Sequence, residues 1–353
     1  MFHYCKDGNH EKKKSNLSLN KILWVPLMVM ILLGVISVFS FNHYQVKAQP
    51  QIVNGILDLR GWDLRRDGPI ILDGEWSFYW NRLLSLDDLE GTNTLDSNGF
   101  YKVPSAWNSY QVDNQKLLGQ GYATYHLKVR MGDQPQSLAI KIPTVSTAYT
   151  VMVDHRIIAT GGVVATDAKH AIGEYKPQVV SFQPFGTEFD LIVQVSNYLY
   201  NRRGMWHPFE LGTTEQLTIL CENALVEEMI LLGSALMMGL YHIGIYLQRR
   251  KNKSALYFGI GCLIEAARLL VIEEMFILNI TLSVSLKFII FVEYITYYGG
   301  MAVFLLFFYE LYPDQYSKKV VKTLLSLSGC FILTVIFSPI SFYTRIVGFY
   351  HLL

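Results

Sequence analysis

A block of closely spaced apolar stretches between about Leu225 and Ile340 constrains this chain more than any other feature. Each stretch has close to the 20 or so apolar residues that a helix needs to cross a hydrocarbon core about 30 Å thick. We therefore predict four consecutive membrane-spanning helices in this block. They are expected at Met229–Leu247, Ser254–Ile272, Phe288–Tyr309 and Thr323–Ile340.

The charges between these stretches predict their orientation. Gln248–Lys253 is strongly basic, and Lys318, Lys319 and Lys322 mark a second basic turn. The intervening loop, from Glu273 to Leu286, has neither Lys nor Arg. Because loops rich in Lys and Arg stay in the cytoplasm, both basic loops are expected there, with the loop between them outside.

A further apolar stretch, Ile22–Phe41, lies near the start of the chain and contains no charged residue. Residues 1–21, which carry several lysines, are expected to be cytoplasmic. The stretch is either a signal anchor or a signal peptide cleaved near Val46-Lys47-Ala48, whose small residues resemble a cleavage site. Both alternatives export the chain that follows.

Residues 50–220 contain no apolar run long enough to span a membrane, and their side chains alternate instead. Between Tyr122 and Arg130 the odd positions are apolar, and the same period of two recurs at 138–142 and 189–196. This period is typical of half-buried β-strands. Many short strands separated by turns predict an all-β sandwich or jelly roll. Only Asn81–Leu89 has a helical pattern.

Composition excludes several functional classes. Of the 353 residues 51% are hydrophobic, and the net charge of +1 does not favour a nucleic-acid partner. None of the four cysteines lies between Gln51 and Leu220, so disulfides cannot stabilise the β domain. No serine-hydrolase, metalloprotease, phosphate-loop or Cys-x-x-Cys motif is present. We therefore expect no catalytic site, no cofactor and no metal site in this chain.

Two loop segments of the β domain are candidates for ligand binding. Trp107 follows Val103-Pro104-Ser105, and Trp206 follows Arg202 and Arg203. Aromatic rings provide platforms for sugars and other small ligands, and guanidinium groups bind carboxylates and hydroxyls. The alternative is ordinary: tryptophans of a β domain are usually core residues, and an Arg-Arg-Gly-x-Trp loop is usually a solvated loop.

His242, Glu265, Arg268 and Glu293 are ionisable residues that fall within the predicted spans. Such groups face protein or a water-filled cavity because hydrocarbon tolerates them poorly. Glu265 and Arg268 are three residues apart on one helix face, so they are expected to form a pair. The pair would be either a polar switch shared with His242 and Glu293 or a local device that fixes packing. Glu293 alone could also extend to the membrane surface.

Several short motifs resemble the bacterial seven-transmembrane receptors with diverse intracellular signalling modules. The similarity begins near Ile56 and covers most of the chain. In the β domain the matching segments are Leu72–Trp80, Val103–Trp107, Gly121–Tyr125 and Val195–Asn197, and in the apolar block they are Met238–His242, Ala255–Gly259, Arg268, Glu293-Tyr294 and Leu311–Pro313.

The resemblance implies an extracellular jelly roll of galactose-binding-like fold, seven spans and a cytoplasmic output module, commonly a histidine kinase or a diguanylate cyclase. Residues 225–353 then form a partial block of four spans and the start of a fifth. The expected function is a receptor input module for an extracellular small molecule or carbohydrate, embedded in membrane lipid, with its output module absent from this chain. The alternatives are an exported carbohydrate-active enzyme or a transporter fragment, and whether the chain forms a homodimer stays open.

Overall fold

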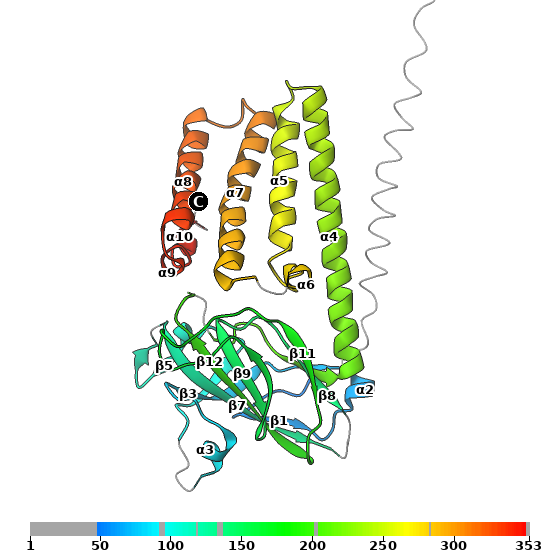
Figure 1. Cartoon of the computed structure of the whole chain (residues 1–353), viewed down its shortest axis with the longest axis vertical. Helices are drawn as coiled ribbons and strands as arrows, with labels where there is room; N and C mark the ends of the chain where they lie inside the picture. The colour runs from blue at the N-terminus through cyan, green and yellow to red at the C-terminus, as the bar shows by residue number, and fades with distance from the viewer. Residues whose placement is uncertain are drawn as a thin grey trace, which may run out of the picture. The chain divides into compact units, whose positions relative to one another are not determined.

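The chain divides into two units, residues 1–49 and 50–353. The computed structural model describes residues 48–91, 96–117, 119–132, 137–200, 204–281 and 284–350. The predicted anchor or signal peptide at 22–41 therefore lies outside the described residues. Within the second unit, a β-sheet region comes first in the chain and a helical region follows (Figure 1).

The larger sheet of the β region has seven strands in the order β10-β9-β12-β7-β3-β4, with β1 pairing in parallel to β7. All its other pairings are antiparallel. Its strands are β1 (Ile56–Leu59), β3 (Gly74–Trp80), β4 (Phe100–Val103), β7 (Gly121–Met131), β9 (Ala148–Val153), β10 (Arg156–Gly161) and β12 (Glu188–Asn197).

The second sheet has four strands in the order β11-β8-β13-β2 and packs against the first through one apolar core. The core combines Tyr125 and Val193 of the large sheet with Ile140 and Leu211 of the small one, all completely buried. The predicted two-sheet sandwich is thus present. The small sheet contains β2 (Ile70–Ile71), β8 (Leu138–Ile142), β11 (Gln178–Phe182) and β13 (Glu210–Thr213), and β5 (Gln111–Val112) and β6 (Gln115–Lys116) form a separate hairpin.

Alternation predicts the inner face of the large sheet correctly but underestimates burial of its outer face. The odd positions of β7 are buried as expected, yet Ile192 and Asp190 on the outer face of β12 are buried too. A small apolar cluster explains part of this, because Leu86 of the neighbouring helix packs with Met152 and Ile192. Asp190 is instead covered by polar partners from β7, since it lies 2.6 Å from the His126 ring nitrogen.

The helical segment expected at Asn81–Leu89 is shorter than predicted and displaced toward the C-terminus. Helix α3 runs from Leu86 to Glu90, and Ser85 and Asp88 form a capping box at its start. The helical pattern also missed α2 (Leu64–Asp67), whose first turn is capped by the Asp63 side chain. A 3-10 turn spans Trp107–Ser109.

The first long helix, α4 (Thr214–Gln248), follows β13 without a linker. Thr213 and Gln216 form a capping box, and the Gln216 side chain also donates a hydrogen bond of 2.7 Å to the Leu64 carbonyl. These contacts satisfy free backbone groups at the helix start and fix it to the sandwich. The helix therefore begins well before Met229, where the apolar pattern placed the start of the span.

The remaining helices lie where the apolar stretches predict them, although their ends differ by a few residues. Within the described part of the chain, three helices are long and apolar enough to cross a membrane: α4, α7 and α8. Helix α5 has the 17 residues Lys253–Leu269, so it is a little short by itself. The helices after α4 are α5, α6 (Ile277–Ile280), α7 (Leu286–Leu311), α8 (Lys318–Phe337), α9 (Ile340–Tyr343) and α10 (Val347–Tyr350).

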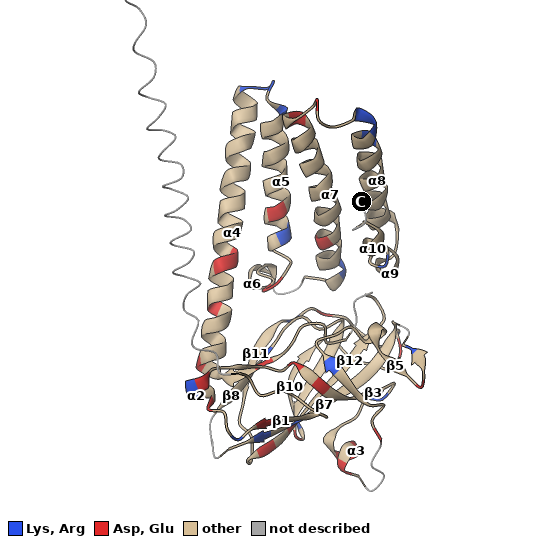
Figure 2. Ribbon diagram, turned by 180° about the vertical axis from the view of Figure 1, so that it is seen from behind, with Lys and Arg blue, Asp and Glu red and all other residues tan. Residues whose placement is uncertain are grey.

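Helices α4, α5, α7 and α8 stand side by side in chain order (Figure 1). Small residues allow α4 and α5 to approach closely, because a methyl group added at Gly239 would lie only 3.2 Å from the Gly259 carbonyl oxygen. The basic ends of these helices, after α4 and at the start of α8, gather at the end away from the sandwich (Figure 2).

Candidate functional site

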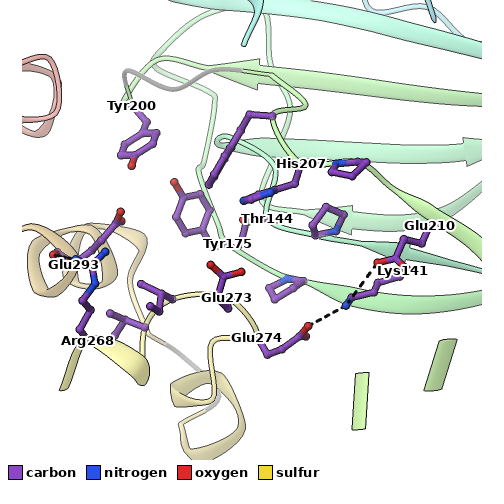
Figure 3. A pocket seen from close by; sticks show the side chains of 16 residues that line it. Lys141, Thr144, Tyr175, Tyr200, His207, Glu210, Arg268, Glu273, Glu274 and Glu293 are labelled. Atoms are coloured by element: carbon purple, nitrogen blue, oxygen red, sulfur yellow. Dashed lines mark hydrogen bonds and ion pairs between the residues drawn. The ribbon is translucent and has the colours of Figure 1, made fainter. Parts of the chain in front are cut away.

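A cavity of about 380 Å³ lies where the sandwich meets the helices. The sandwich contributes Lys141 of β8 and residues of the segments 175–177 and 206–210, and the helical region contributes residues 268 and 271–274 with Glu293 (Figure 3). No single element forms this cavity. It exists only because residues far apart in sequence are brought together by both halves of the fold.

Aromatic side chains form one wall of the cavity. Tyr175 and Tyr200 are almost fully buried and meet edge to face, with ring centroids 6.3 Å apart. Buried Asn197 positions Tyr200: its side-chain oxygen accepts the Tyr200 amide at 3.0 Å, and its amide group donates to the Tyr200 carbonyl at 2.9 Å. Burial raises the pKa of the Tyr200 hydroxyl well above its usual value, so this wall stays uncharged.

Trp206 provides a second aromatic surface on the sandwich side. Its indole nitrogen donates a hydrogen bond of 3.0 Å to the buried Ser146 hydroxyl, which fixes the orientation of the ring. The ring also lies 3.9 Å, centroid to centroid, from the His207 imidazole. Trp206 is only half-buried, so it remains accessible to a ligand in the cavity.

A cluster of charges crosses from the sandwich to the helical region. The Lys141 ammonium lies 2.9 Å from a Glu274 carboxylate oxygen and 3.8 Å from one of Glu210. Burial opposes the charged form of Lys141, but the hydrogen bond and charge of Glu274, with the charge of Glu210, raise its pKa overall. Burial raises the pKa of Glu210, and the Lys141 charge offsets this only in part. The Lys141–Glu274 contact is therefore a direct ionic link between the two regions.

The turn after α5 holds Glu274 in place from behind. The backbone amide of Glu274 donates a hydrogen bond of 2.9 Å to the carboxylate of Glu228, a buried residue of α4. The preceding residue, Glu273, adopts a left-handed backbone with φ 50°. That conformation is uncommon for a residue with a side chain and typically has a local reason. Here it directs the Glu273 carboxylate into the cavity (Figure 3).

Arg268 and Glu293 line the cavity from α5 and α7. The Arg268 guanidinium donates to the Glu293 backbone carbonyl at 3.4 Å and lies 5.3 Å from the centre of the Tyr297 ring. These contacts join α5 to α7 at the end that faces the sandwich. Of the residues predicted to form an intramembrane switch, the structure thus brings Arg268 and Glu293 together and adds Trp206 to the same cavity.

The expected pair between Glu265 and Arg268 is not formed. Glu265 is exposed on α5, and no salt bridge joins it to any residue in the described part of the chain. The three-residue spacing does place the two residues on neighbouring positions of the helix. The predicted pair is nevertheless not formed, because Arg268 turns toward α7, where a carbonyl group and an aromatic ring stabilise its charge.

His242 lies apart from the other predicted switch residues. It lines a separate cavity of about 310 Å³ between α4, α5 and α7, and its ring lies 4.5 Å from the Phe258 ring. Its Nδ1 atom is 2.9 Å from the Met238 carbonyl, which can only accept, so this nitrogen carries the hydrogen. This hydrogen bond lies within α4 and does not link His242 to Arg268 or Glu293.

Trp107 is a core residue and does not reach the cavity. It is completely buried, packs edge to face against Trp80 at 5.2 Å and donates to the Gly119 carbonyl at 3.3 Å. The loop-like sequence before it misled the prediction, because Trp107 belongs to a 3-10 turn whose side chain is in the core. Arg202 and Arg203, the other two candidates for ligand binding, lie outside the described residues.

Sequence reasoning missed most of the lining residues. Lys141 carried one usable signal, because it is the charged residue between Ile140 and Ile142 of an otherwise apolar strand. The three-dimensional proximity of Tyr175, Tyr200 and Glu274 had no sequence signal. Among the described residues, no group of three His, Cys, Asp or Glu side chains is arranged to hold a metal ion.

Comparison with known families supports a receptor-like membrane block. A family described as 7TM diverse intracellular signalling matches residues 226–353. This match begins within α4, covers the helices that follow and leaves the sandwich unassigned. No curated protein is significantly similar to the chain.

Solved structures resemble the chain only weakly. A β-glucuronidase from an uncultured Clostridium species has a TM-score of 0.31 and 16% identity, covering 40% of this chain and 28% of its own. The Ruminococcus gnavus β-glucuronidase in complex with uronic isofagomine has a TM-score of 0.31 and 12% identity over 41% and 28%. An Eisenbergiella tayi β-galacturonidase bound to galacturonate has a TM-score of 0.28 and 17% identity over 41% and 24%. Similarity at this level says nothing about the activity of this chain. The chain spans less than a third of each enzyme.

Proposed function

We propose that this chain is the input module of a membrane receptor, in which an extracellular sandwich and the helices share one ligand site. The observation that carries this proposal is the cavity lined from both regions. A ligand that fills it contacts Trp206 and Lys141 on one side and Arg268 and Glu273 on the other. Its binding energy therefore depends on how the two regions are arranged.

This arrangement supports signalling for a thermodynamic reason. A ligand shifts a conformational equilibrium only by the difference between its affinities for the two states. A site within the sandwich alone would not sense the helices. A site that bridges both regions binds more tightly to the arrangement that closes it, so occupancy favours one position of the helix ends. The signal then passes along the helices to a cytoplasmic output module.

The direct junction between β13 and α4 supports the same proposal. The capping box at Thr213 and the Gln216–Leu64 hydrogen bond leave no flexible segment between sheet and helix. Movement of the small sheet is therefore expected to move the first turn of α4. The alternative of an exported carbohydrate-active enzyme is not favoured, because the matched family is one of signalling membrane domains.

Topology is tested by cysteine labelling in intact cells, in a background whose native cysteines are replaced. A cysteine at Lys169 should react with an impermeant maleimide, because the proposal places the sandwich outside. A cysteine at Asn252, in the basic loop after α4, should react only after the membrane is permeabilised. The reverse pattern would overturn the orientation.

Ligand coupling is tested by placing one fluorophore on the sandwich and another at the far end of α5, then titrating small molecules. A molecule that binds the cavity should change energy transfer, and Trp206→Ala and Lys141→Met should each remove that change. Phe185→Ala, an exposed position of the sandwich away from the cavity, is the matched control and should leave it intact. A ligand that binds without altering energy transfer in any detergent or lipid would contradict the shared site.

A further inference from the structure

Lys287 marks the point where α7 reaches the membrane surface on the side of the sandwich. Residues 288–309 contain one charged side chain, Glu293, and are long enough to cross a hydrocarbon core about 30 Å thick. Lys287 is exposed and forms no salt bridge in the part of the chain that the structure describes. Long cationic side chains at the ends of membrane helices extend to the lipid headgroups.

The segment that follows β10 brings the sandwich to this boundary. A methyl group added at Gly173 would lie 2.7 Å from Leu286 Cδ2, so the backbone here is in close contact with the first turn of α7. An open cavity of about 790 Å³ lies beside this contact. Its lining includes Ala171 and Ile172 from the sandwich and residues 284–287 from the start of α7. The cavity therefore lies at the level where α7 enters the membrane.

The same segment presents two apolar side chains in fixed positions. Val163 and Ile172 are joined by backbone hydrogen bonds of 2.8 and 3.0 Å, and their exposed fractions are 48% and 61%. The Ala165 amide donates to the Ser196 hydroxyl at 3.3 Å, and the Tyr198 hydroxyl donates to the Ala165 carbonyl at 3.3 Å. These bonds hold the segment to the sandwich. An apolar pair fixed beside a membrane helix fits a place among lipid headgroups.

Polar residues at the tip of the segment limit how deep it can lie. Asp167, Lys169 and His170 are exposed, and the Asp167 carboxylate accepts the backbone amides of the other two at 2.9 and 3.1 Å. Charged groups are costly in hydrocarbon, so the segment stays in the headgroup region. Glu174, the one carboxylate among the described lining residues, accepts the Gly162 amide at 2.9 Å.

We propose that residues 163–172 rest on the lipid leaflet at the sandwich side of the membrane, with Val163 and Ile172 between lipids and a phospholipid headgroup in the cavity. The phosphate of that headgroup lies beside Lys287, whose charge complements it. Lipid is the partner because the segment is continuous with the membrane surface of α7. This surface is separate from the proposed ligand site, and the inference does not depend on that site.

The first test measures contact with lipid in the complete chain, with its native cysteines replaced, in vesicles of phosphatidylcholine and phosphatidylglycerol. One fluorophore is attached to Ile172→Cys and, in a second sample, to Ile157→Cys. Ile157 is the matched control, because it is 64% exposed but lies at the end of β10 remote from the segment. Lipids with a nitroxide on the headgroup should quench the fluorophore at position 172 strongly and leave the one at 157 unaffected.

The second test locates the headgroup. The fluorophore at position 172 reports binding while the chain in detergent is titrated with dihexanoyl phosphatidylglycerol, dihexanoylglycerol or glycerol phosphate. Lys287→Gln should weaken binding of the phospholipid about fivefold, the effect of losing one cation near a lipid surface. Lys253→Gln, an exposed lysine in the basic loop at the other end of the helices, should have no effect. Dihexanoylglycerol, which lacks the phosphate, should bind more weakly than the phospholipid.

Three results would contradict the proposal. Equal quenching at positions 172 and 157, or quenching at neither, would overturn the contact between this segment and lipid. Glycerol phosphate that binds as tightly as the phospholipid would make the cavity a site for a free phosphate and overturn the choice of partner. Unchanged phospholipid affinity in Lys287→Gln would overturn the position of the headgroup.

Discussion

The core of the sandwich and the cavity at its junction with the helices are built from similar aromatic residues but held together differently. In the core, Trp76, Phe78, Trp107 and Tyr125 are completely buried. Phe78 packs against Tyr125, and Trp107 packs against Trp80. At the junction, aromatic rings alternate with carboxylates and amines that remain partly accessible. The core gains its stability from close packing, which permits one arrangement. The junction depends on pairwise charges, which can be rearranged at low cost.

The largest expected effect is in the core. Trp107→Ala should lower the free energy of unfolding by about 3–5 kcal/mol, the usual range for an aromatic residue removed from a packed interior. Trp206→Ala should lower it by less than about 1 kcal/mol, because that ring is half-buried beside a cavity. Thermal unfolding of both variants in the same detergent provides the comparison. Equal losses would show that the junction is packed as tightly as the core.

The next effect concerns the ionic link at the junction. Lys141→Met should destabilise the chain by about 2 kcal/mol, somewhat less than the loss for a fully buried pair, because Glu274 and Glu210 keep some solvent access. The double variant with Glu274→Met should recover part of that loss, since one stranded carboxylate is gone. A double variant whose loss equals the sum of the two single losses would show that the residues are not coupled.

A smaller effect is expected in the pH dependence of stability, which should differ between Asp190 on the sheet and Glu210 at the junction. Burial opposes ionisation of Asp190 on the outer face of the large sheet, but His126 and then Lys128 outweigh it, so its pKa is lowered. A lowered pKa contributes stability above the unfolded value, about 3.9, and that stability is lost as pH falls through the folded value. Asp190→Asn should therefore cost about 1 kcal/mol at neutral pH, and the deficit should vanish in acid.

Glu210 should behave in the opposite sense. Its raised pKa contributes stability that is complete below the unfolded value, about 4.3, and is lost as pH rises through the folded value. Glu210→Gln should therefore reduce the dependence of stability on pH above the unfolded value. It should not show the loss of stability at neutral pH that is expected for Asp190→Asn. Denaturation series across pH measure both slopes. Slopes of the same sign would contradict the assignment of the two environments.

The smallest expected effect tests the contact that is missing within α5. Because Glu265 is exposed and Arg268 faces α7, Glu265→Leu and Arg268→Leu should be additive, with a coupling energy below about 0.5 kcal/mol. Arg268→Leu alone should be the more harmful change, since it also removes the contact with the Glu293 carbonyl. A large coupling energy would show that Glu265 and Arg268 interact, as the helical spacing predicted.

Local periodicity predicted the elements of the fold but not their meeting points. The alternation at 122–130 located β7, and apolar stretches located α4, α5, α7 and α8, because both patterns arise from the residue's own segment. The cavity depends on contacts such as Lys141–Glu274, whose partners are separated by more than a hundred residues and share no pattern. Trp107 and Trp206 show the limit clearly, since both follow loop-like sequence and only the tertiary fold distinguishes core from cavity.

Continuity between β13 and α4 has a mechanical consequence. The helix has 35 residues, so it is roughly 50 Å long, and its first turn directly follows β13, an internal strand of the small sheet. A rod held at one end works as a lever: a rotation of about 3° at the sheet displaces the far end by roughly 2–3 Å. A ligand that rotates the sheet by a few degrees would then displace the opposite end of α4 by a few ångströms.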